Sequence, residues 1–508
     1  MGDLQIHTNG IHKMLCNLQP NKAAGPDNIS PRVLKELATE LAPCLEIVFQ
    51  SSYESGMVPE DWRTAHVSPI FKMGEKYKAS NYRPVSLTCI VSKLMEHIIT
   101  SNIMKHTTEN NILYNLQHGF RAKLSCETQL IEFVSDTIDN MSHGTQTDVI
   151  VMDFAKAFDK VSHQKLVWKM NRYGICGKTN AWVNSFLTDR TQRVLVEGEQ
   201  SSVAPVSSGV PQGSVLGPCL FLLYINDMPE GIDSTVRLFA DDTIIYTALK
   251  PKSNSITLQQ DLDKLAQWGK DWNMQFHPDK CQVIPLTRQR KIEQNKYTLN
   301  GHTLEITDTA KYLGINITSD LSWNKHVDTI SSKANRTLGF LRRNIKISSP
   351  KIKSQAYASL VRPTLEYASP VWNPHTKRNT NKLEMVQRRA ARFVLNRFHN
   401  TSSVSDMVNH LEWRSLEHRR LDASLCLFYK IVNGMVLIPA HPHLIPLQRS
   451  TRLHHPLAFQ IPHSNSDYHR YSFFPRVIRL WNTLPTSFVM TPTYDAFKSS
   501  IQSYPYPA

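Results

Sequence analysis

Two adjacent carboxylates, Asp241 and Asp242, constrain the fold of this chain more than any other feature. Short apolar runs flank them, residues 236–240 before and 243–246 after, which is the pattern of a strand–turn–strand hairpin. Neighbouring like charges are costly unless a cation offsets them. A hard divalent ion with oxygen ligands, Mg²⁺ or Mn²⁺, is the natural partner. Taken alone, the pair favours the other interpretation, an ordinary polar turn.

A second carboxylate stands at the end of an apolar run. Residues 148–154 read as a buried strand that delivers Asp153 at its C-terminal end, and Asp159 follows shortly after. In-line phosphoryl transfer with two metal ions needs carboxylates from separate strands at one point. Asp153 with the Asp241–Asp242 pair supplies such a set, although spacing alone does not decide between Asp153 and Asp159.

Residues 209–217 contain three Gly and one Pro and are predicted to form a loop that leads into a helix at 218–227. Gly and Gln in such a loop allow close approach to a base or sugar, although the signal is weak by itself. Gly177-Lys178-Thr179 resembles the end of a phosphate-binding loop, but Arg172 stands where the first Gly of that motif belongs. A P-loop nucleoside triphosphatase is therefore rejected.

Periodicity predicts mixed secondary structure in the first two thirds and basic helices after residue 320. Beyond about residue 436, frequent Pro and His make regular elements doubtful. The predicted helices are 29–52 (opened by Ser30-Pro31, with an apolar face of Val33, Leu34, Leu37, Leu41, Leu45 and Val48), 87–107, 124–141, 162–172, 257–274, 325–345, 351–361 and 379–398. The predicted strands, besides those above, are 66–71, a hairpin over 192–206, and a single strand over 311–317.

Positive charge is concentrated at the C-terminal end of the 508 residues. Residues 321–508 hold 26 Lys and Arg against 9 Asp and Glu, a net charge of +17, whereas residues 1–320 hold 32 against 34. This asymmetry indicates a polyanionic partner such as nucleic acid, with a solubilising surface as the alternative. Arginines at near-helical spacing are the candidate phosphate contacts: Arg388, Arg389, Arg392 and Arg397. The aromatics among them, Trp372, Phe393 and Phe398, are expected to pack in a core more readily than to stack on bases.

Eight scattered Cys without any C-x2-C pair argue against a zinc finger and for a reducing compartment. Residues 1–10 have no apolar core of a signal peptide, and the longest apolar stretch, 216–225, is about half the length of a membrane helix. We therefore expect an intracellular protein without a membrane partner, in the nucleus or the cytoplasm.

Taken together and in this order, the motifs resemble the reverse transcriptases of non-LTR (LINE-type) retrotransposons, closest to the jockey-like group. The resemblance covers roughly residues 15–318 and is specific as a set. Its segments are Lys22–Asp27 (N-terminal extension), Trp62–Arg63, Ile70–Lys72 and Asn81–Leu87 (fingers), Gln117–Arg121, and then Asp153–Asp159, Gln212–Gly213, Phe239–Asp242, Trp272–Lys280 and Tyr312–Gly314 (palm). Residues 319–508 match such elements less specifically.

The resemblance implies an α+β right-hand polymerase fold with fingers, palm and thumb and a mostly helical basic C-terminal region. It implies an RNA-directed DNA polymerase that adds deoxynucleotides to a primer 3′-hydroxyl on an RNA template with two Mg²⁺ or Mn²⁺ ions. The partners would be an RNA template, a DNA primer or target, and deoxynucleoside triphosphates. The expected domains are 1–51 (helical N-terminal extension), 52–318 (fingers and palm), 319–400 (thumb-like) and 401–508 (basic, Pro- and His-rich).

Residue roles follow from the same resemblance. Asp153, rather than Asp159, joins Asp241 and Asp242 as a metal-binding catalytic carboxylate. The remaining roles are triphosphate binding by Lys72 and Arg83, an aromatic gate against a ribose 2′-hydroxyl at Phe158, contact with nucleotide or template near Gln212 and Gly213, and general-acid action on the pyrophosphate leaving group by Lys280.

The chain also departs from full-length relatives. It begins at the N-terminal extension without the endonuclease, and no zinc knuckle or ribonuclease H carboxylate cluster follows. These departures leave open a truncated element copy. The alternatives are a catalytically inactive or domesticated nucleic-acid-binding remnant and an intron-type splicing cofactor with the same fold.

Overall fold

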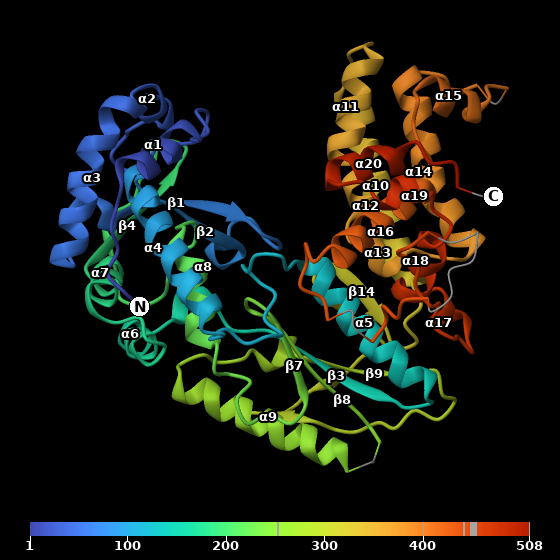
Figure 1. Cartoon of the computed structure of the whole chain (residues 1–508), viewed down its shortest axis with the longest axis horizontal. Coiled ribbons are helices and arrows are strands. Elements are labelled where there is room, and N and C mark those ends of the chain that lie inside the picture. Colours follow the sequence, from blue (N-terminus) through green and yellow to red (C-terminus); the bar gives the residue numbers. More distant parts are fainter. Residues whose placement is uncertain (251–252, 400, 440–441, 448–454, 507–508) are drawn as a thin grey trace. The chain divides into compact units, whose positions relative to one another are not determined.

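The computed structural model describes residues 1–250, 253–399, 401–439, 442–447 and 455–506 (Figure 1). The chain forms two compact units, each assembled from three separate stretches of sequence. The first unit comprises Met1–Phe120, Met152–Thr243 and Gln260–Pro278, and the second comprises Arg121–Val151, Ile244–Gln259 and Asp279–Ala508. Both contain helices and strands, which confirms the α+β class. Within the described residues, no helix has the length and apolar character needed to cross a bilayer.

The first unit packs helices around a sheet whose strand order is β2-β1-β4-β5, with β6 also paired to β4. β1 runs antiparallel to β2 and parallel to β4, and the predicted strand 66–71 and hairpin 192–206 are thereby confirmed. Its helices are α1 (Thr8–Cys16), α2 (Pro31–Glu36), α3 (Ala38–Ser55), α4 (Ile90–Glu109), α6 (His163–Arg172), α7 (Gly177–Leu187), α8 (Leu216–Ile225) and most of α9 (Asn254–Asp271). Its strands are β1 (Thr64–Phe71), β2 (Tyr82–Leu87), β4 (Arg190–Val196), β5 (Glu199–Gln200), β6 (Ala204–Val206), β7 (Thr235–Phe239) and the start of β8 (Asp242–Ala248).

The apolar stretch 216–225 is the buried helix α8, in which every described side chain except Pro218 is buried. Such a helix is apolar on all sides because it is surrounded by protein. It packs against α4 and α6 in the first unit (Figure 1). The core of this unit therefore lies directly behind the loop that precedes α8.

The predicted single helix 29–52 is wrong in detail. Ser30 does cap the helix N-terminus, with Pro31 in the first turn, but the helix stops at Glu36 and restarts at Ala38. Leu37 adopts a non-helical conformation (φ −99°, ψ 27°), and no Gly or Pro at that position signals the break. Three residues of the predicted apolar face are exposed instead: Val33, Leu37 and Val48.

The second unit contains most of a five-stranded sheet, two two-stranded sheets and the C-terminal helices. Within it the strand order is β12-β9-β3-β8, with β3 antiparallel to β9 and β9 parallel to β12. The strands are β3 (Thr147–Met152), β9 (Gln282–Leu286), β10 (Thr298–Leu299), β11 (His302–Thr303), β12 (Glu305–Ile306), β13 (Thr309–Tyr312) and β14 (Ile315–Thr318). The helices are α5 (Cys126–Ser142), α10 (Asn324–Asn344), α11 (Pro350–Leu360), α12 (Arg362–Glu366), α13 (Ser369–Trp372), α14 (Lys377–Leu395), α15 (Val404–His410), α16 (Leu416–Val432), α17 (Asp467–Arg470), α18 (Phe473–Trp481), α19 (Thr486–Val489) and α20 (Tyr494–Gln502).

The single strand predicted over 311–317 is instead a hairpin. Leu313 and Gly314 both have positive φ, 43° and 84°, and reverse the chain between β13 and β14. Two such residues in succession are the mark of the tight hairpin turns that match strand twist. The Tyr367 hydroxyl donates a hydrogen bond to the Leu313 carbonyl at 3.0 Å. This bond ties the turn to the C-terminal end of α12, where Tyr367 lies.

Regular helices continue beyond residue 455, which corrects the expectation that Pro and His disrupt this segment. The prolines stand where a helix tolerates them: Pro475 lies in the first turn of α18, and Pro485 precedes α19. Aromatic side chains from α16, α18 and α20 fill the core, with Tyr429 stacked on Phe497 at 4.4 Å between ring centroids. Residues 440–441 and 448–454 of the Pro- and His-rich segment lie outside the described residues.

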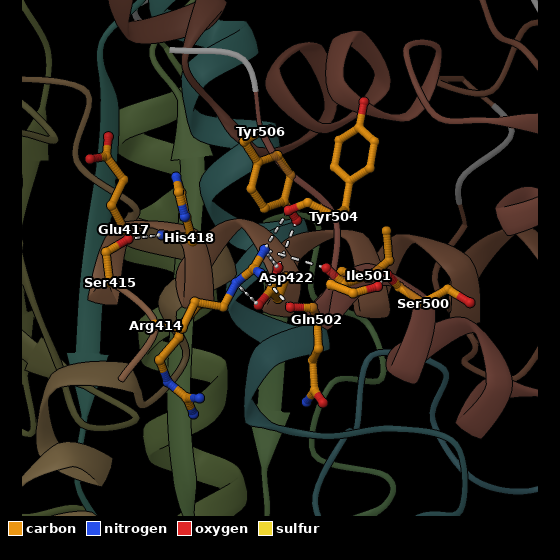
Figure 2. Close-up of polar contacts among 12 residues, drawn as sticks. Arg414, Ser415, Glu417, His418, Asp422, Ser500, Ile501, Gln502, Tyr504 and Tyr506 are labelled. Atoms are coloured by element: carbon orange, nitrogen blue, oxygen red, sulfur yellow. Dashed lines mark hydrogen bonds and ion pairs between the residues drawn. The ribbon is translucent and has the colours of Figure 1, made fainter. Parts of the chain in front are cut away.

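A cluster of polar contacts fastens the C-terminal segment to α16 (Figure 2). Arg414 forms an ion pair with Asp422 (Nε to Oδ2, 3.0 Å) and donates a hydrogen bond from Nη2 to the Tyr504 carbonyl at 3.0 Å. The Tyr506 hydroxyl donates to Asp422 Oδ1 at 2.8 Å. Arg414 also donates to carbonyls at the end of α20, so one guanidinium joins a buried carboxylate to the last helix.

We expect Arg414→Leu to lower the free energy of unfolding by about 3 kcal/mol, because removing one partner of a mostly buried pair leaves the other charge uncompensated. Urea unfolding followed by tryptophan fluorescence measures this. Tyr506→Phe is the matched control: it removes one hydrogen bond to the same carboxylate and is expected to cost about 1 kcal/mol. An Arg414→Leu cost no larger than that of Tyr506→Phe would contradict the proposed fastening.

Candidate active site

Asp153 follows β3 directly, as the apolar run predicted. The segment 275–277 holds its backbone from the side: the His277 amide donates to the Asp153 carbonyl at 2.8 Å, and the Ala155 amide donates to the Gln275 carbonyl at 2.9 Å. Phe154 stacks on Phe276 with ring centroids 4.4 Å apart. Asp153 is thus held on a rigid stretch of backbone in the first unit, and its side chain is half-buried.

Asp241 and Asp242 lie at the turn between β7 and β8, which confirms the predicted hairpin. Ala240 has φ 55°, an unfavourable conformation for a residue with a Cβ. Its amide donates to the side-chain oxygen of Gln117 at 2.9 Å, and the Gly119 amide donates to the same oxygen at 2.8 Å. A buried side-chain amide therefore fixes the shape of the turn.

Gln117 and Gly119 position the turn that carries the carboxylates, and the sequence pattern did not reveal this role. Gln117 is 2% exposed, and its backbone forms a parallel bridge with Leu238. A Cβ at Gly119 would lie 2.4 Å from the amide nitrogen of Ala240, so only Gly allows this approach. The available signal is a Gln and a Gly two residues apart in Gln117–Arg121, which the resemblance assigned only to the segment leading to the palm.

The carboxylates influence one another electrostatically. Burial and then repulsion from Asp241 and Asp153 raise the pKa of Asp242 to about 6. Burial and the charge of Asp153 also raise the pKa of Asp241. The side chain of Asp242 nevertheless remains open to solvent. Three acidic groups from two places in the sequence thus repel one another within the first unit.

Two cations of the β1–β2 hairpin oppose this repulsion. Arg83 lies on β2 opposite Ile70, and the Lys72 amide donates to the Asn81 carbonyl at 2.8 Å just beyond β1. The charges of Arg83 and Lys72 both lower the pKa values of Asp241 and Asp242. Both side chains are exposed, so they are available to a ligand. The structure therefore brings Lys72 and Arg83 within electrostatic range of the carboxylates.

Residues 209–213 are placed against the segment that carries Phe158 and Asp159. Gln212 donates from Nε2 to Asp159 Oδ1 at 3.1 Å, and its carbonyl accepts the Ser86 amide at 2.6 Å. Gly213 has φ 111°, and a Cβ there would lie 2.6 Å from the Ser86 carbonyl oxygen. The glycines of this loop allow its backbone to approach the backbone of neighbouring segments closely. The Gln212 side chain is held by Asp159.

Glu96 anchors the same loop and was missed by sequence reasoning. Its carboxylate is fully buried and accepts the amides of Val215 (2.7 Å) and Leu216 (3.1 Å) at the start of α8. Burial raises the pKa of Glu96, and the two amides and the charge of Arg190 oppose that rise. A negative charge at a helix N-terminus is favourable, so the pair of amides offsets the cost of burying it.

Phe158 is half-buried and stacked flat on Phe221 of α8, with centroids 4.3 Å apart and planes 14° apart. Phe120 packs against Phe158 in an edge-on (T-shaped) arrangement, with 6.5 Å between the ring centroids. Because Phe221 belongs to the core, the orientation of the Phe158 ring is set from behind. Its ring is therefore a fixed wall of the segment that joins Asp153 to Asp159.

The remaining predicted residues belong to the second unit. Lys280 ends a short 3-10 turn, Pro278–Lys280, and its role stays a prediction. Arg388 and Arg389 are exposed on α14, Arg392 is half-buried on the same helix, and Arg397 is exposed just beyond it. Arg389 donates to the Asn335 side chain at 3.1 Å.

Metal binding by these residues was tested on their chemistry. Across the described parts of the chain, no group of three or more His, Cys, Asp or Glu is arranged to hold a metal ion. The repulsion that raises the pKa values of Asp241 and Asp242 is nevertheless the kind that a divalent cation removes. All three groups offer the oxygen ligands that Mg²⁺ and Mn²⁺ prefer.

Comparison with known families locates this site within a recognised domain. The profile of the family described as "Reverse transcriptase (RNA-dependent DNA polymerase)" matches residues 72–317. That match includes Asp153, Asp241 and Asp242. Residues 72–317 therefore resemble a reverse transcriptase domain. The domain begins at Lys72 and ends in β14, so it draws on both compact units.

Curated relatives place the reverse transcriptase domain among those of mobile elements, which confirms the non-LTR resemblance. An RNA-directed DNA polymerase from mobile element jockey of Drosophila melanogaster is 29% identical over 402 residues, 76% of this chain and 43% of that protein. A probable RNA-directed DNA polymerase from transposon BS of the same organism is 27% identical over 410 residues, 77% of this chain and 44% of that protein. The chain spans less than half the length of these relatives. A solved structure of apo telomerase from Candida tropicalis, truncated from its C-terminal domain, has a TM-score of 0.37 at 13% identity and covers 59% of this chain and 62% of that chain.

We predict that the reverse transcriptase domain is destabilised by deprotonation of Asp242 when divalent ions are absent. The folded-state pKa, about 6, lies above the ordinary value of 3.8, so the folded state binds the proton more tightly. The resulting stabilisation is present below about pH 4 and is lost as the pH rises through 6. In EDTA, Asp242→Asn should therefore gain stability relative to the wild type as the pH rises from 4 to 7, measured by urea unfolding. A difference independent of pH would contradict the prediction.

Proposed function

We propose that the chain is an RNA-directed DNA polymerase that extends a primer 3′-hydroxyl on an RNA template, within the cell, using deoxynucleoside triphosphates. The observation that carries the proposal is the electrostatic coupling of Asp153, Asp241 and Asp242, opposed by Lys72 and Arg83. An anionic centre beside two exposed cations suits a substrate that combines a triphosphate with metal ions. The family match and the names of the relatives support the same reaction.

Asp153, Asp241 and Asp242 are the residues that would hold the divalent ions, Mg²⁺ or Mn²⁺. When bound, two such ions activate a primer hydroxyl and neutralise charge on the leaving pyrophosphate. The chain contributes the positions of the ligands. Gln117 fixes the turn of Asp241 and Asp242, and the segment 275–277 fixes the backbone at Asp153. Preorganised ligands of this kind avoid reorganisation during the reaction.

The cations and the loop complete the substrate site in this proposal. Arg83 and Lys72 bind the triphosphate from the β1–β2 hairpin, where both side chains are exposed. The loop at Gln212 and Gly213 supports the nucleotide or the template from the other side of β2. Lys280 is retained as the proposed general acid toward pyrophosphate.

Phe158 is proposed to exclude ribonucleotides. The Phe158 ring is held flat against Phe221, so it cannot shift to make room for a ligand. A ring in a fixed position would clash with the additional 2′-hydroxyl of a ribonucleotide. The backbone of Phe158 also accepts the Val210 amide at 2.9 Å, which ties the ring to the loop of Gln212. The gate and the nucleotide loop therefore form one packed piece.

The basic residues 321–508 are proposed to bind the RNA template and the DNA primer or target through phosphates. Arg388 and Arg389 are exposed on α14, as a phosphate contact requires. Trp372 and Phe393 are buried, as expected for core aromatics, whereas Phe398 is 45% exposed. Contacts of this kind fix the nucleic acid in place without reading its sequence.

Primer extension on an RNA template tests the proposed activity. Asp153→Asn, Asp241→Asn and Asp242→Asn should each reduce the rate by about 100-fold or more, because each removes a charge that the reaction centre needs. Asp263→Asn, on the exposed side of α9, is the matched control and should extend the primer at the wild-type rate. A folded wild-type chain that leaves the primer unextended with both Mg²⁺ and Mn²⁺ would identify a nucleic-acid-binding remnant instead.

Phe158→Val should raise kcat/KM for ribonucleotides by about tenfold or more while changing deoxynucleotide use little, because a smaller side chain leaves room for a 2′-hydroxyl. Single-nucleotide incorporation with each nucleotide type measures the ratio. Phe221→Leu loosens the stack behind the ring, so it should lower stability and also raise ribonucleotide use, but less than Phe158→Val does. Unchanged discrimination in Phe158→Val would show that the ring serves packing alone.

A further inference from the structure

The second unit contains a cavity of about 320 Å³ outside the polymerase site. It lies where the C-terminal ends of α10 and α14 meet the beginning of α11, three helices that pack on one another. Cations and aromatics dominate its lining, and none of the described residues that line it is acidic. The lining residues used below are Arg342, Lys346, Ser348, Lys353, Phe393 and Phe398.

Lys353 is the unusual member of this lining. It is only 8% exposed, and its ammonium lies 5.2 Å from the ring centroid of Phe393. Among the described residues, no carboxylate pairs with Lys353, Arg342 or Lys346. A buried ammonium without an anion is costly, and a cation–π contact offsets only part of that cost. The cavity therefore offers a positive charge that is open to an anionic ligand.

Helix ends explain part of the charge, but not Lys353. Arg342 stands in the last turn of α10, where a cation is favourable because helix C-termini are partially negative. Lys353 stands near the N-terminus of α11, which begins at Pro350 and is partially positive. A buried cation at that position is unfavourable on both counts. An anion in the cavity would remove both costs.

We propose that this cavity binds a phosphate group of a single-stranded nucleic acid, with the neighbouring base stacked on Phe398. Phe398 is 45% exposed, and the Arg342 guanidinium lies over its ring at 5.1 Å. Exposed aromatics beside cations are the usual means of holding single strands. The assignment to nucleic acid rests on the proposed function. The residues differ from Arg388, Arg389, Arg392 and Arg397, which the sequence nominated.

The test compares two charge-matched triple variants of the full chain. The cavity variant is Arg342→Gln, Lys346→Gln and Lys353→Met, in which Met keeps the length of the buried stem on Phe393. The control is Arg336→Gln, Arg343→Gln and Lys351→Gln, three exposed cations of α10 and α11 that do not line the cavity. The probe is a 12-nucleotide single-stranded RNA with a 3′ fluorescent label, titrated in EDTA at several salt concentrations.

We expect the cavity variant to bind the RNA about tenfold or more weaker, with a slope of log affinity against log salt shallower by about 0.7 for one lost phosphate contact. The control should change affinity less than threefold. Phe398→Leu alone should weaken binding by about fivefold or more through lost stacking. If the triple variant does not fold, as judged by its melting temperature, Lys353→Met and Phe398→Leu carry the test singly.

Equal losses in both triple variants would overturn the proposal, because they would show a diffuse charge effect. Unchanged binding in the cavity variant, with only a lower melting temperature, would also overturn it. Probes with a 5′-phosphate or a 5′-hydroxyl distinguish a terminal from an internal phosphate, and either result supports the pocket. Adenosine monophosphate is the remaining arm: its binding to the cavity without any effect of the cavity variant on RNA would assign a small phosphorylated ligand and overturn the nucleic-acid proposal.

Primer extension by the same proteins separates this proposal from the proposed function. A wild type that fails to extend a primer, yet binds RNA in a cavity-dependent way, would remove the polymerase assignment and leave the pocket. A wild type that extends primers, together with a cavity variant that binds RNA normally, would remove the pocket alone.

Discussion

The arrangement of the candidate active site depends on one buried side-chain amide. Gln117 accepts two backbone amides through one oxygen, and one of them belongs to Ala240 in the left-handed conformation. Adjacent carboxylates repel each other, so a turn that carries Asp241 and Asp242 together has no local reason to keep this shape. The hydrogen bonds from a segment more than a hundred residues earlier in the chain supply that reason. Gly119 belongs to the same device, since a Cβ there would collide with the turn.

The loop of Gln212 is likewise held by a buried side chain, the carboxylate of Glu96. Glu96 on α4 places a carboxylate at the N-terminus of α8, and its two amide bonds fix where α8 begins. The loop of Gln212 ends at that point, and Phe221 of α8 supports the ring of Phe158. One buried charge therefore positions both the loop of Gln212 and the ring of Phe158. Buried charges with complete hydrogen bonding restrict a structure to one arrangement, which suits a site built from separate segments.

The sequence predicts those parts of this structure that local patterns encode. Asp153 at a strand end and the Asp241–Asp242 hairpin were expected because apolar runs flank them, and the structure confirms both placements. The break at Leu37 was missed because no Gly or Pro at that position indicates it. The hairpin at Leu313 and Gly314 was missed although its glycine was visible. Gln117 and Glu96 could not be found, since each acts on a segment about 120 residues away. The catalytic and binding roles remain predictions that the fold accommodates.

The charge of the basic region overstates the surface it offers to a polyanion. Arg420 is fully buried, and Arg476 is 8% exposed with its guanidinium donating to the carbonyls of Pro370 and Asn373. Burial, and then the charge of Arg420, lower the pKa of Arg476 to about 9. These two arginines serve the core: Arg476 donates to backbone carbonyls, and Arg420 donates from Nε to the side-chain oxygen of Asn373 at 2.9 Å. Net charge therefore indicates the sign of the charge on a partner. Only the position of each cation shows whether that partner can contact it. By that criterion Arg388 and Arg389 on α14 offer a general field, and Lys353, buried without an anion in a cavity, points to a specific ligand.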